Sequence, residues 1–402
     1  MKKSKVLNIK GALLDKNQLS KYIEKVAAEH NIKNSSNKET YPIVNLKENY
    51  RFILETYNLL NKHLKLGIKI HSAGDWLLDN FYIIEETVKS IEKDLTIHKY
   101  KKMMGISNGP YSGFARCYVL AEEIIAFSDC KIDREIIDLS LNSYQRKKLL
   151  SMEEICSIGI FLKISLISHI KELCEKIYSS QIQKYRAENI IGRIIENKNI
   201  RELNFINTAN MKRTLENMPK YSFIEYMSYK LKKYGKKTIP YQEILEKEVQ
   251  KLGLTISDVV QKEHFYIANT KITLGNSITS IKTINRINFS ELFSYMNASE
   301  EILKLDPSGI YSIMDQESKS YYRGVIENLS KKTKISEIYI AEKVIALCKR
   351  YENYKSLEER KKSHVGYYLI KEGITELKKE LEIKNTKYIK LKEKSKIYVA
   401  TN

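Results

Sequence analysis

The sequence predicts an all-α protein, a multi-helix array with no sheet of consequence. The chain has 402 residues but only 15 glycines and 5 prolines, the residues that sheet-rich folds use at their many turns. No window of about four to eight residues alternates strictly between apolar and polar side chains and is flanked by hairpin turns. Helical periodicity, in contrast, recurs along the chain and decides the fold class.

The clearest amphipathic helix is predicted from Asp75 to about Leu95. Its apolar residues recur at alternating spacings of four and three, which places them on one face of a helix. They are Leu77, Phe81, Ile84, Val88, Ile91 and Leu95. Charged residues, among them Asp79 and Glu86, fall on the opposite side. Ser72, three residues before Asp75, resembles the start of a capping box.

Helices are also predicted before and after this one. Residues 1–40 predict one short amphipathic helix and a polar linker at residues 34–38, and a helix follows from about Leu46 to Leu64. The break at residues 105–110 precedes a helix at 113–127. Asp133 is a predicted N-cap for a helix to Tyr144.

Ser151 and Glu154 form a capping box, which predicts the start of a long helix reaching Ile177. Its most apolar stretch, residues 155–170, is broken by Lys163. The stretch is shorter than the roughly 20 residues that a membrane-spanning helix needs. It therefore predicts a buried core helix.

The second half carries further start signals. Capping boxes are predicted at residues 222–225 and 356–359, and Pro240 fits the first turn of a helix to Leu252. Asp315 and Ser336 are predicted to cap helices that end near residues 329 and 351. We expect an N-terminal helix and linker at 1–45, helical subdomains at 46–200 and 201–375, and a charged tail at 376–402.

The chain is basic, with 69 Lys and Arg against 49 Asp and Glu, a formal net charge of +20. Such a surplus makes nucleic acid and an anionic membrane candidate partners. The basic residues are mostly lysines spread over every predicted helix, and no nucleic-acid-binding signature is present. Nucleic acid is therefore disfavoured, and any membrane contact is predicted to be peripheral.

The cysteines predict a reducing compartment. Five are present, widely separated and without a C-x-x-C pair, so neither a zinc site nor a disulfide framework is expected. No apolar stretch long enough for a signal peptide follows the basic start of the chain. We expect a cytoplasmic protein, with the inner face of the plasma membrane as a candidate location.

No catalytic, cofactor-binding or metal-binding residues are predicted. The seven histidines lack metal-ligand spacing, and no phosphate-binding or nucleophile motif is found. Adjacent glutamates such as Glu85 and Glu86 point about 100° apart on a helix, so they form no acid–base pair by themselves. Asp75 and Asp79 do share a face, which suits a basic side chain or a polar ligand. The small residues 275–277 favour a turn or a close helix approach.

Four segments, taken in order, resemble the N-terminal region of the cyclic β-1,2-glucan synthases, which are large bacterial membrane proteins. The first is the helix that begins Asp75-Trp76-Leu77-Leu78-Asp79-Asn80. The second runs from Tyr118 to Asp129, and the third has Ile272 to Ser280 at its centre. The last combines Asp306 to Tyr311, Tyr322 to Ile326 and His364 to Leu369. Together they span residues 70–375.

The resemblance implies a cytoplasmic helical region that precedes membrane helices and a processive, UDP-glucose-dependent glucosyltransferase. That chemistry needs a D-x-D element and a Q-x-x-R-W element, and this sequence has neither; its single tryptophan is Trp76. We therefore expect a truncated or separately encoded, non-catalytic module. Its expected partner is the membrane-embedded glucan synthase or the remaining domains of that enzyme.

A free-standing carbohydrate-binding protein is the alternative, with β-glucan as the ligand and exposed aromatic residues stacking on sugar. For either function, the predicted interaction surface combines charged and aromatic residues from the resembling segments. They are Asp75, Trp76, Asp79, Glu86, Tyr322, Arg323, His364, Tyr367 and Tyr368.

Overall fold

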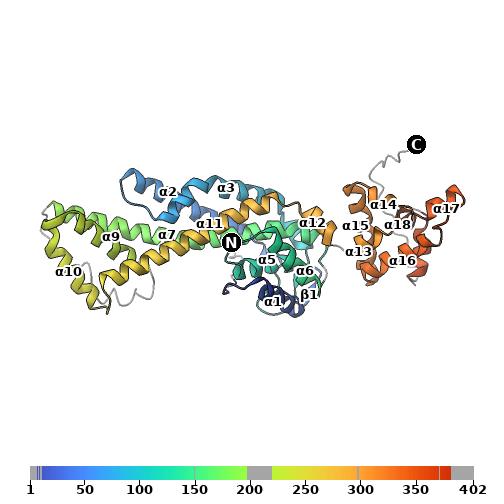
Figure 1. Cartoon of the computed structure of the whole chain (residues 1–402), viewed down its shortest axis with the longest axis horizontal. Helices are drawn as coiled ribbons and strands as arrows, with labels where there is room; N and C mark the ends of the chain where they lie inside the picture. The colour runs from blue at the N-terminus through green and yellow to red at the C-terminus, as the bar shows by residue number, and fades with distance from the viewer. Residues whose placement is uncertain are drawn as a thin grey trace. The chain divides into compact units, whose positions relative to one another are not determined.

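The computed structural model describes residues 7, 9, 11–148, 150–196, 220–296, 298–370 and 372–381. These residues are predominantly α-helical, which confirms the predicted class (Figure 1). The sheet among them has two short strands, β1 (Ile32–Lys33) and β2 (Gly105–Ile106), paired antiparallel. Backbone contacts divide the chain into two units, residues 1–290 and 291–402.

The first unit is built around one long helix. Its helices are α1 (Lys16–Glu29), α2 (Ile43–Lys65), α3 (Ser72–Asp94), α4 (Ile97–Lys102), α5 (Arg116–Phe127), α6 (Arg134–Gln145), α7 (Met152–Ile195), α9 (Lys220–Lys233), α10 (Ile239–Gln250) and α11 (Ile256–Arg286). Helix α7 contacts α2, α3, α5, α9 and α11, so its faces are covered along its length (Figure 1). α12 (Phe289–Met296) follows at the boundary between the units.

The long central helix starts as predicted but runs further. Ser151 and Glu154 form a reciprocal capping box, and the apolar residues 155, 158, 161, 162 and 164 are buried, as expected for a core helix. The helix continues 18 residues beyond Ile177, to Ile195. Its last turns pack against α9, where the buried Ala187, Ile191 and Ile194 join a core cluster.

The helix that the sequence marks most clearly, α3, begins earlier than predicted. Ser72 is its first residue and not its cap. His71 is the N-cap, and its Nδ1 accepts a hydrogen bond from the Ala73 N–H at 3.1 Å. The predicted apolar face is correct, because Leu77, Ile84 and Val88 are buried.

One other local prediction is wrong. Ser222 does not open a helix, because it lies inside α9, where its hydroxyl donates to Glu263 at 2.5 Å. A partner distant in sequence thus outweighs the local pattern at Ser222. The expected linker at 34–38 lies between α1 and α2, and it is docked there: the Asn37 N–H donates to the Gly113 carbonyl at 2.8 Å.

The second unit is a compact set of short helices. They are α13 (Ala298–Leu303), α14 (Ile310–Ile313), α15 (Gln316–Thr333), α16 (Glu337–Lys349), α17 (Leu357–Lys362), α18 (Val365–Ile370) and α19 (Ile374–Glu380). Their core includes Tyr311, Ile326, Val344 and Leu369. The predicted caps Asp315, Ser336 and Ser356 each accept a backbone N–H, as expected.

The predicted domain ranges stay a prediction. The expected boundary near residue 200 lies outside the described residues, as does most of the predicted tail at 376–402. Backbone contacts place α11 with α3 and α7, in the first unit.

Candidate functional site

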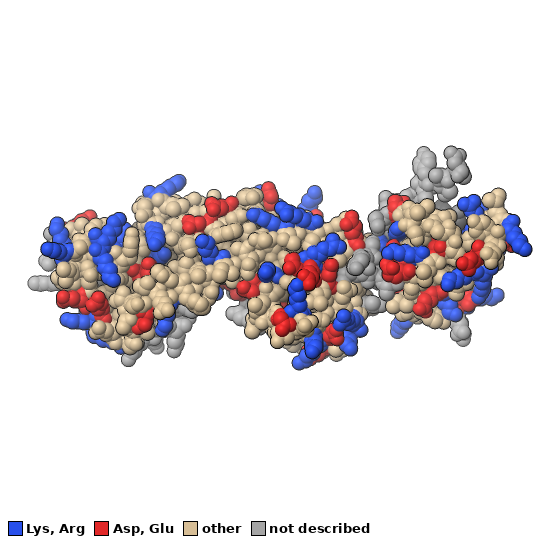
Figure 2. All heavy atoms as spheres, in the orientation of Figure 1, with Lys and Arg blue, Asp and Glu red and all other residues tan. Residues whose placement is uncertain are grey.

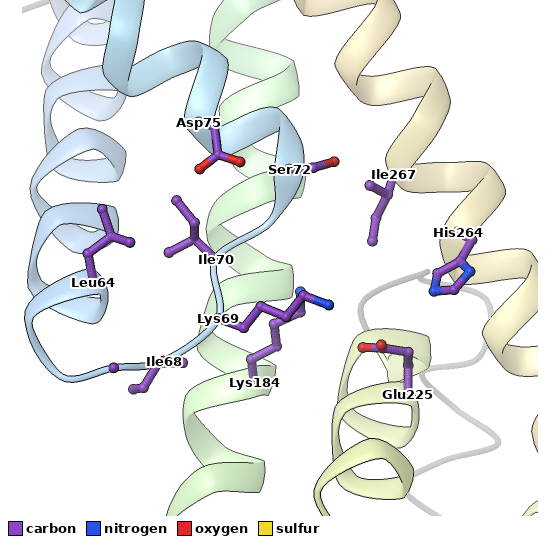
Figure 3. Close-up of a pocket in the computed structure, with 11 residues that line it drawn as sticks. Leu64, Ile68, Lys69, Ile70, Ser72, Asp75, Lys184, Glu225, His264 and Ile267 are labelled. Carbon is purple, nitrogen blue, oxygen red and sulfur yellow. The ribbon is translucent and has the colours of Figure 1, made fainter.

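A cavity of about 610 Å³ opens in the first unit beside the start of α3 (Figure 3). The α2–α3 connection, α7, α9 and α11 form its walls. Its polar lining residues are Lys69, Ser72, Asp75, Lys184, Glu225 and His264. Ile68, Ile70 and Ile267 add apolar surface. The predicted surface residue Asp75 thus lies at a concave site.

Lys184 is the most unusual group of this cavity. It projects from α7 and is only 3% exposed, and its amine lies near that of Lys69 (Figure 3). Burial lowers the pKa of the Lys184 amine, whereas the charges of Glu225 and Glu263 act to raise it. Lys184 forms no ion pair with any residue that the structure describes.

A buried hydrogen-bond network fixes the walls of the cavity. Gln181, one turn before Lys184 on α7, accepts from the His71 N–H at 3.2 Å and donates to the Lys69 carbonyl at 3.4 Å. Ser222 on α9 lies 2.8 Å from Ser180 Oγ and donates to Glu263 on α11. Burial raises the pKa of the Glu263 carboxyl, against the effect of the Ser222 hydrogen bond. The side chains of α7 therefore hold the connection, α9 and α11 together.

The remaining predicted residues of α3 are exposed. Trp76 is 37% exposed, and Asp79 and Glu86 are exposed as well. Burial and the Asp79 charge raise the pKa of Asp75, while Lys271 of α11 lowers it. Glu86 lines a second cavity of about 570 Å³ between α3, α7 and α11.

The predicted residues of the second unit gather at one place. Tyr322 Oη lies 3.4 Å from His364 Nε2, and His364 Nδ1 donates to Asp306 Oδ2 at 2.8 Å. Although burial opposes it, hydrogen bonds from His364 and Ser308 lower the pKa of Asp306. The same carboxylate accepts the N–H groups of Tyr311 and Val365, which ties the turn at 306–309 to α18.

Two predicted residues of this group are buried. Arg323 is 2% exposed and pairs with Glu300 at 3.0 Å, and Tyr311 donates to the same carboxylate at 2.7 Å. Tyr368 is fully buried and packs edge-on against the half-buried Tyr367. Arg323 and Tyr368 therefore support the core of the second unit and are not available at its surface.

The small residues of the third resembling segment meet the end of the second. α11 runs without interruption through residues 275–277. Asp129 and Cys130 adopt positive φ angles of 49° and 57°, and Ser280 both donates to the Cys130 carbonyl and accepts from the Ile132 N–H, each at 2.7 Å. The small residues thus allow a strained turn to dock on the helix.

Sequence reasoning missed Lys69, Lys184, Glu225 and His264. Their only common signal is spatial, because they come from four different elements. No group of three or more His, Cys, Asp or Glu side chains among the described residues could hold a metal ion. None of the described helices is both long and apolar enough to cross a membrane.

Charged residues mix over the surface that faces the viewer in Figure 2. Lys and Arg alternate with Asp and Glu on each unit and do not form one continuous basic patch there. This agrees with the dispersed lysines of the sequence.

Comparison with known proteins places the chain near one glucan synthase. No family model matches the sequence. The chain is 20% identical, over 327 residues, to the cyclic β-(1,2)-glucan synthase NdvB of Rhizobium meliloti (strain 1021). The match covers 81% of this chain and 11% of that protein, so the chain spans about a ninth of the relative's length. The chain is therefore a distant relative of cyclic β-(1,2)-glucan synthase.

Proposed function

We propose that this protein is a non-catalytic helical module that positions or regulates a membrane-embedded cyclic β-1,2-glucan synthase. The observation that carries the proposal is the distant relationship over 81% of the chain to a protein named for that synthesis. The resemblance covers a small part of that protein, and the sequence has neither glucosyltransferase element. A partner chain would then supply the chemistry, on the cytoplasmic face of the membrane.

The arrangement of buried charges supports a structural role for most of the chain. Arg116 pairs with Glu154 and Arg323 pairs with Glu300, all inside packed helices. The carboxylate of Asp306 accepts hydrogen bonds that hold the turn at 306–309 and the start of α18. These groups stabilise surfaces of fixed shape, which is what a positioning module must present.

Deletion of the gene in the source organism tests this function. We expect cyclic β-1,2-glucan, extracted and measured by chromatography, to fall at least about threefold, and to return when the gene is restored. The level of the synthase protein is measured in parallel, by immunoblot. An unchanged glucan content at an unchanged synthase level would contradict the proposal.

The carbohydrate-binding alternative is less well supported. It requires exposed aromatic residues that stack on sugar, and of the predicted residues Tyr368 is fully buried. Trp76 keeps enough exposure to contact a sugar ring. Calorimetry with linear and cyclic β-1,2-glucan, on the wild type and on Trp76→Ala, tests the carbohydrate-binding function. That function requires heat of binding in the wild type and none in Trp76→Ala.

A further inference from the structure

The cavity beside α3 combines features of a binding site for a charged small molecule. Its volume of about 610 Å³ falls within the range of small-molecule pockets, roughly 300–1,000 Å³. Two amines, of Lys69 and Lys184, meet in it from different elements (Figure 3). Ion-paired lysines elsewhere on α7, such as Lys171 with Glu175, have a carboxylate partner at 2.6 Å.

Burying Lys184 has an energetic cost that the nearby charges of Glu225 and Glu263 offset only in part. The side chain is 3% exposed and has no ion pair among the described residues. A buried charge is normally paired, because the loss of hydration is otherwise uncompensated. An anion in the cavity would provide the close ion pair that Lys184 lacks among the described residues.

The backbone that carries both lysines is held by the scaffold. Gln181 binds the backbone on both sides of Ile70, through the Lys69 carbonyl and the His71 N–H. Gln181 is fully buried and lies three residues from Lys184 on the same helix. The loop that carries Lys69 is thus tied to the helix that carries Lys184, so the two amines need little rearrangement to share a ligand.

The other polar groups restrict the kind of anion. Asp75 and Glu225 face the same cavity, and neither forms an ion pair with a described residue. Two carboxylates disfavour a bare inorganic anion, but they accept hydrogen bonds from hydroxyl groups. A ligand with an anionic end and several hydroxyls satisfies both sets of groups.

We propose that this cavity binds a small polyhydroxylated anion. The anionic group, a phosphate or a carboxylate, lies on Lys184 and Lys69, and hydroxyl groups donate to Asp75 and Glu225. The apolar wall formed by Ile68, Ile70 and Ile267 covers the carbon skeleton. The inference is independent of the proposed partnership with a synthase, because it concerns the isolated chain.

Isothermal titration calorimetry on the full chain tests this site with four probes: glucose 1-phosphate, gluconate, glucose and inorganic phosphate. We expect glucose 1-phosphate or gluconate to bind with a Kd below about 1 mM, and the two partial probes to bind at least tenfold more weakly. Binding of only one of the two anions identifies the anionic group. No heat from either anion, or equal affinity for inorganic phosphate, would overturn the proposal.

Two variants assign the binding to the cavity. Lys184→Met keeps nearly the same volume, and Lys69→Met changes an exposed side chain, so both should fold. Each should weaken binding of the anionic probe by roughly tenfold or more, because each removes a charged donor. Lys171→Met is the matched control on α7 and should bind as the wild type does. Unchanged affinity in Lys184→Met would overturn the assignment.

Discussion

Two buried cations, Arg323 in the second unit and Lys184 in the first, have different surroundings. In the second unit, Arg323 and Glu300 are both almost fully buried and form an ion pair, and His364 is paired with Asp306. In the first unit, Lys184 is as deeply buried but faces a cavity without an ion-pair partner among the described residues. The difference separates charges that hold a fold together from a charge that is available to a ligand.

The largest effect is expected from breaking the paired charge. Arg323→Met leaves Glu300 buried without its ion-pair partner, and should lower the free energy of unfolding by about 3–5 kcal/mol. Urea denaturation followed by circular dichroism measures this change. Lys304→Met, which removes an exposed ion pair with Glu301, is the control and should cost at most about 1 kcal/mol. Equal losses in the two variants would remove the basis of the comparison.

A second effect depends on pH. Burial lowers the pKa of His71 from 6.5 to about 3, and burial with the Lys148 and Arg116 charges lowers that of His30 to about 4. The unfolded chain takes up these protons at a higher pH than the folded chain does. The contribution of the two histidines to the free energy of unfolding is therefore fully present above pH 6.5 and falls as the pH drops from 6.5 toward 4. Each histidine should contribute a loss of about 2 kcal/mol between pH 6.5 and 5.

Variants separate this pH effect from an opposing one. His71→Asn should reduce the loss on the acid side, and Asn is itself a good N-cap for α3. Burial raises the pKa of Glu122 from 4.5 to about 8, so its contribution is lost as the pH rises from 4.5 to 8. Glu122→Gln should therefore make the acid-side loss larger. Urea denaturation at pH 7 and pH 5 tests both, and variants whose pH dependence equals that of the wild type would contradict the assignment.

Replacing the cavity lysine should raise the free energy of unfolding, whereas replacing Arg323 should lower it. Burial lowers the pKa of the Lys184 amine despite the opposing charges of Glu225 and Glu263. Lys184→Met should therefore raise the free energy of unfolding by about 1 kcal/mol in the absence of ligand. Thermal unfolding of this variant beside Lys171→Met measures the gain. A destabilised Lys184→Met would mean that the amine belongs to the structural network, like Arg323.

The smallest effect is expected at the surface. Lys69 is exposed, and Lys69→Met should change the free energy of unfolding by less than about 0.5 kcal/mol. The same thermal unfolding experiment measures it. A loss comparable to that of Arg323→Met would show that the α2–α3 connection depends on this amine.

Local signals in the sequence explain what could be predicted. Helix caps need only neighbouring residues, so Asp133, Ser151, Asp315 and Ser336 were each identified correctly. The apolar face of α3 follows from spacing alone. The capping box predicted at Ser222 is wrong because the Ser222 hydroxyl donates to Glu263, 41 residues away.

The cavity could not be predicted for the same physical reason. Gln181 and His71 are 110 residues apart, and their hydrogen bond brings Lys69 to Lys184. No local periodicity encodes such a contact. The resemblance to a family located Asp75, at the rim, and the turn at Asp306, whose carboxylate joins two of the resembling segments through His364 and Val365.

The proposed partnership is tested most directly by reconstitution. Membranes that contain the glucan synthase of the source organism, prepared from cells lacking this protein, are mixed with the purified chain and sedimented. We expect the chain to sediment with these membranes, to remain in solution with membranes lacking the synthase, and to change the yield of β-1,2-glucan. Equal sedimentation with both membranes and an unchanged yield would contradict the proposed function.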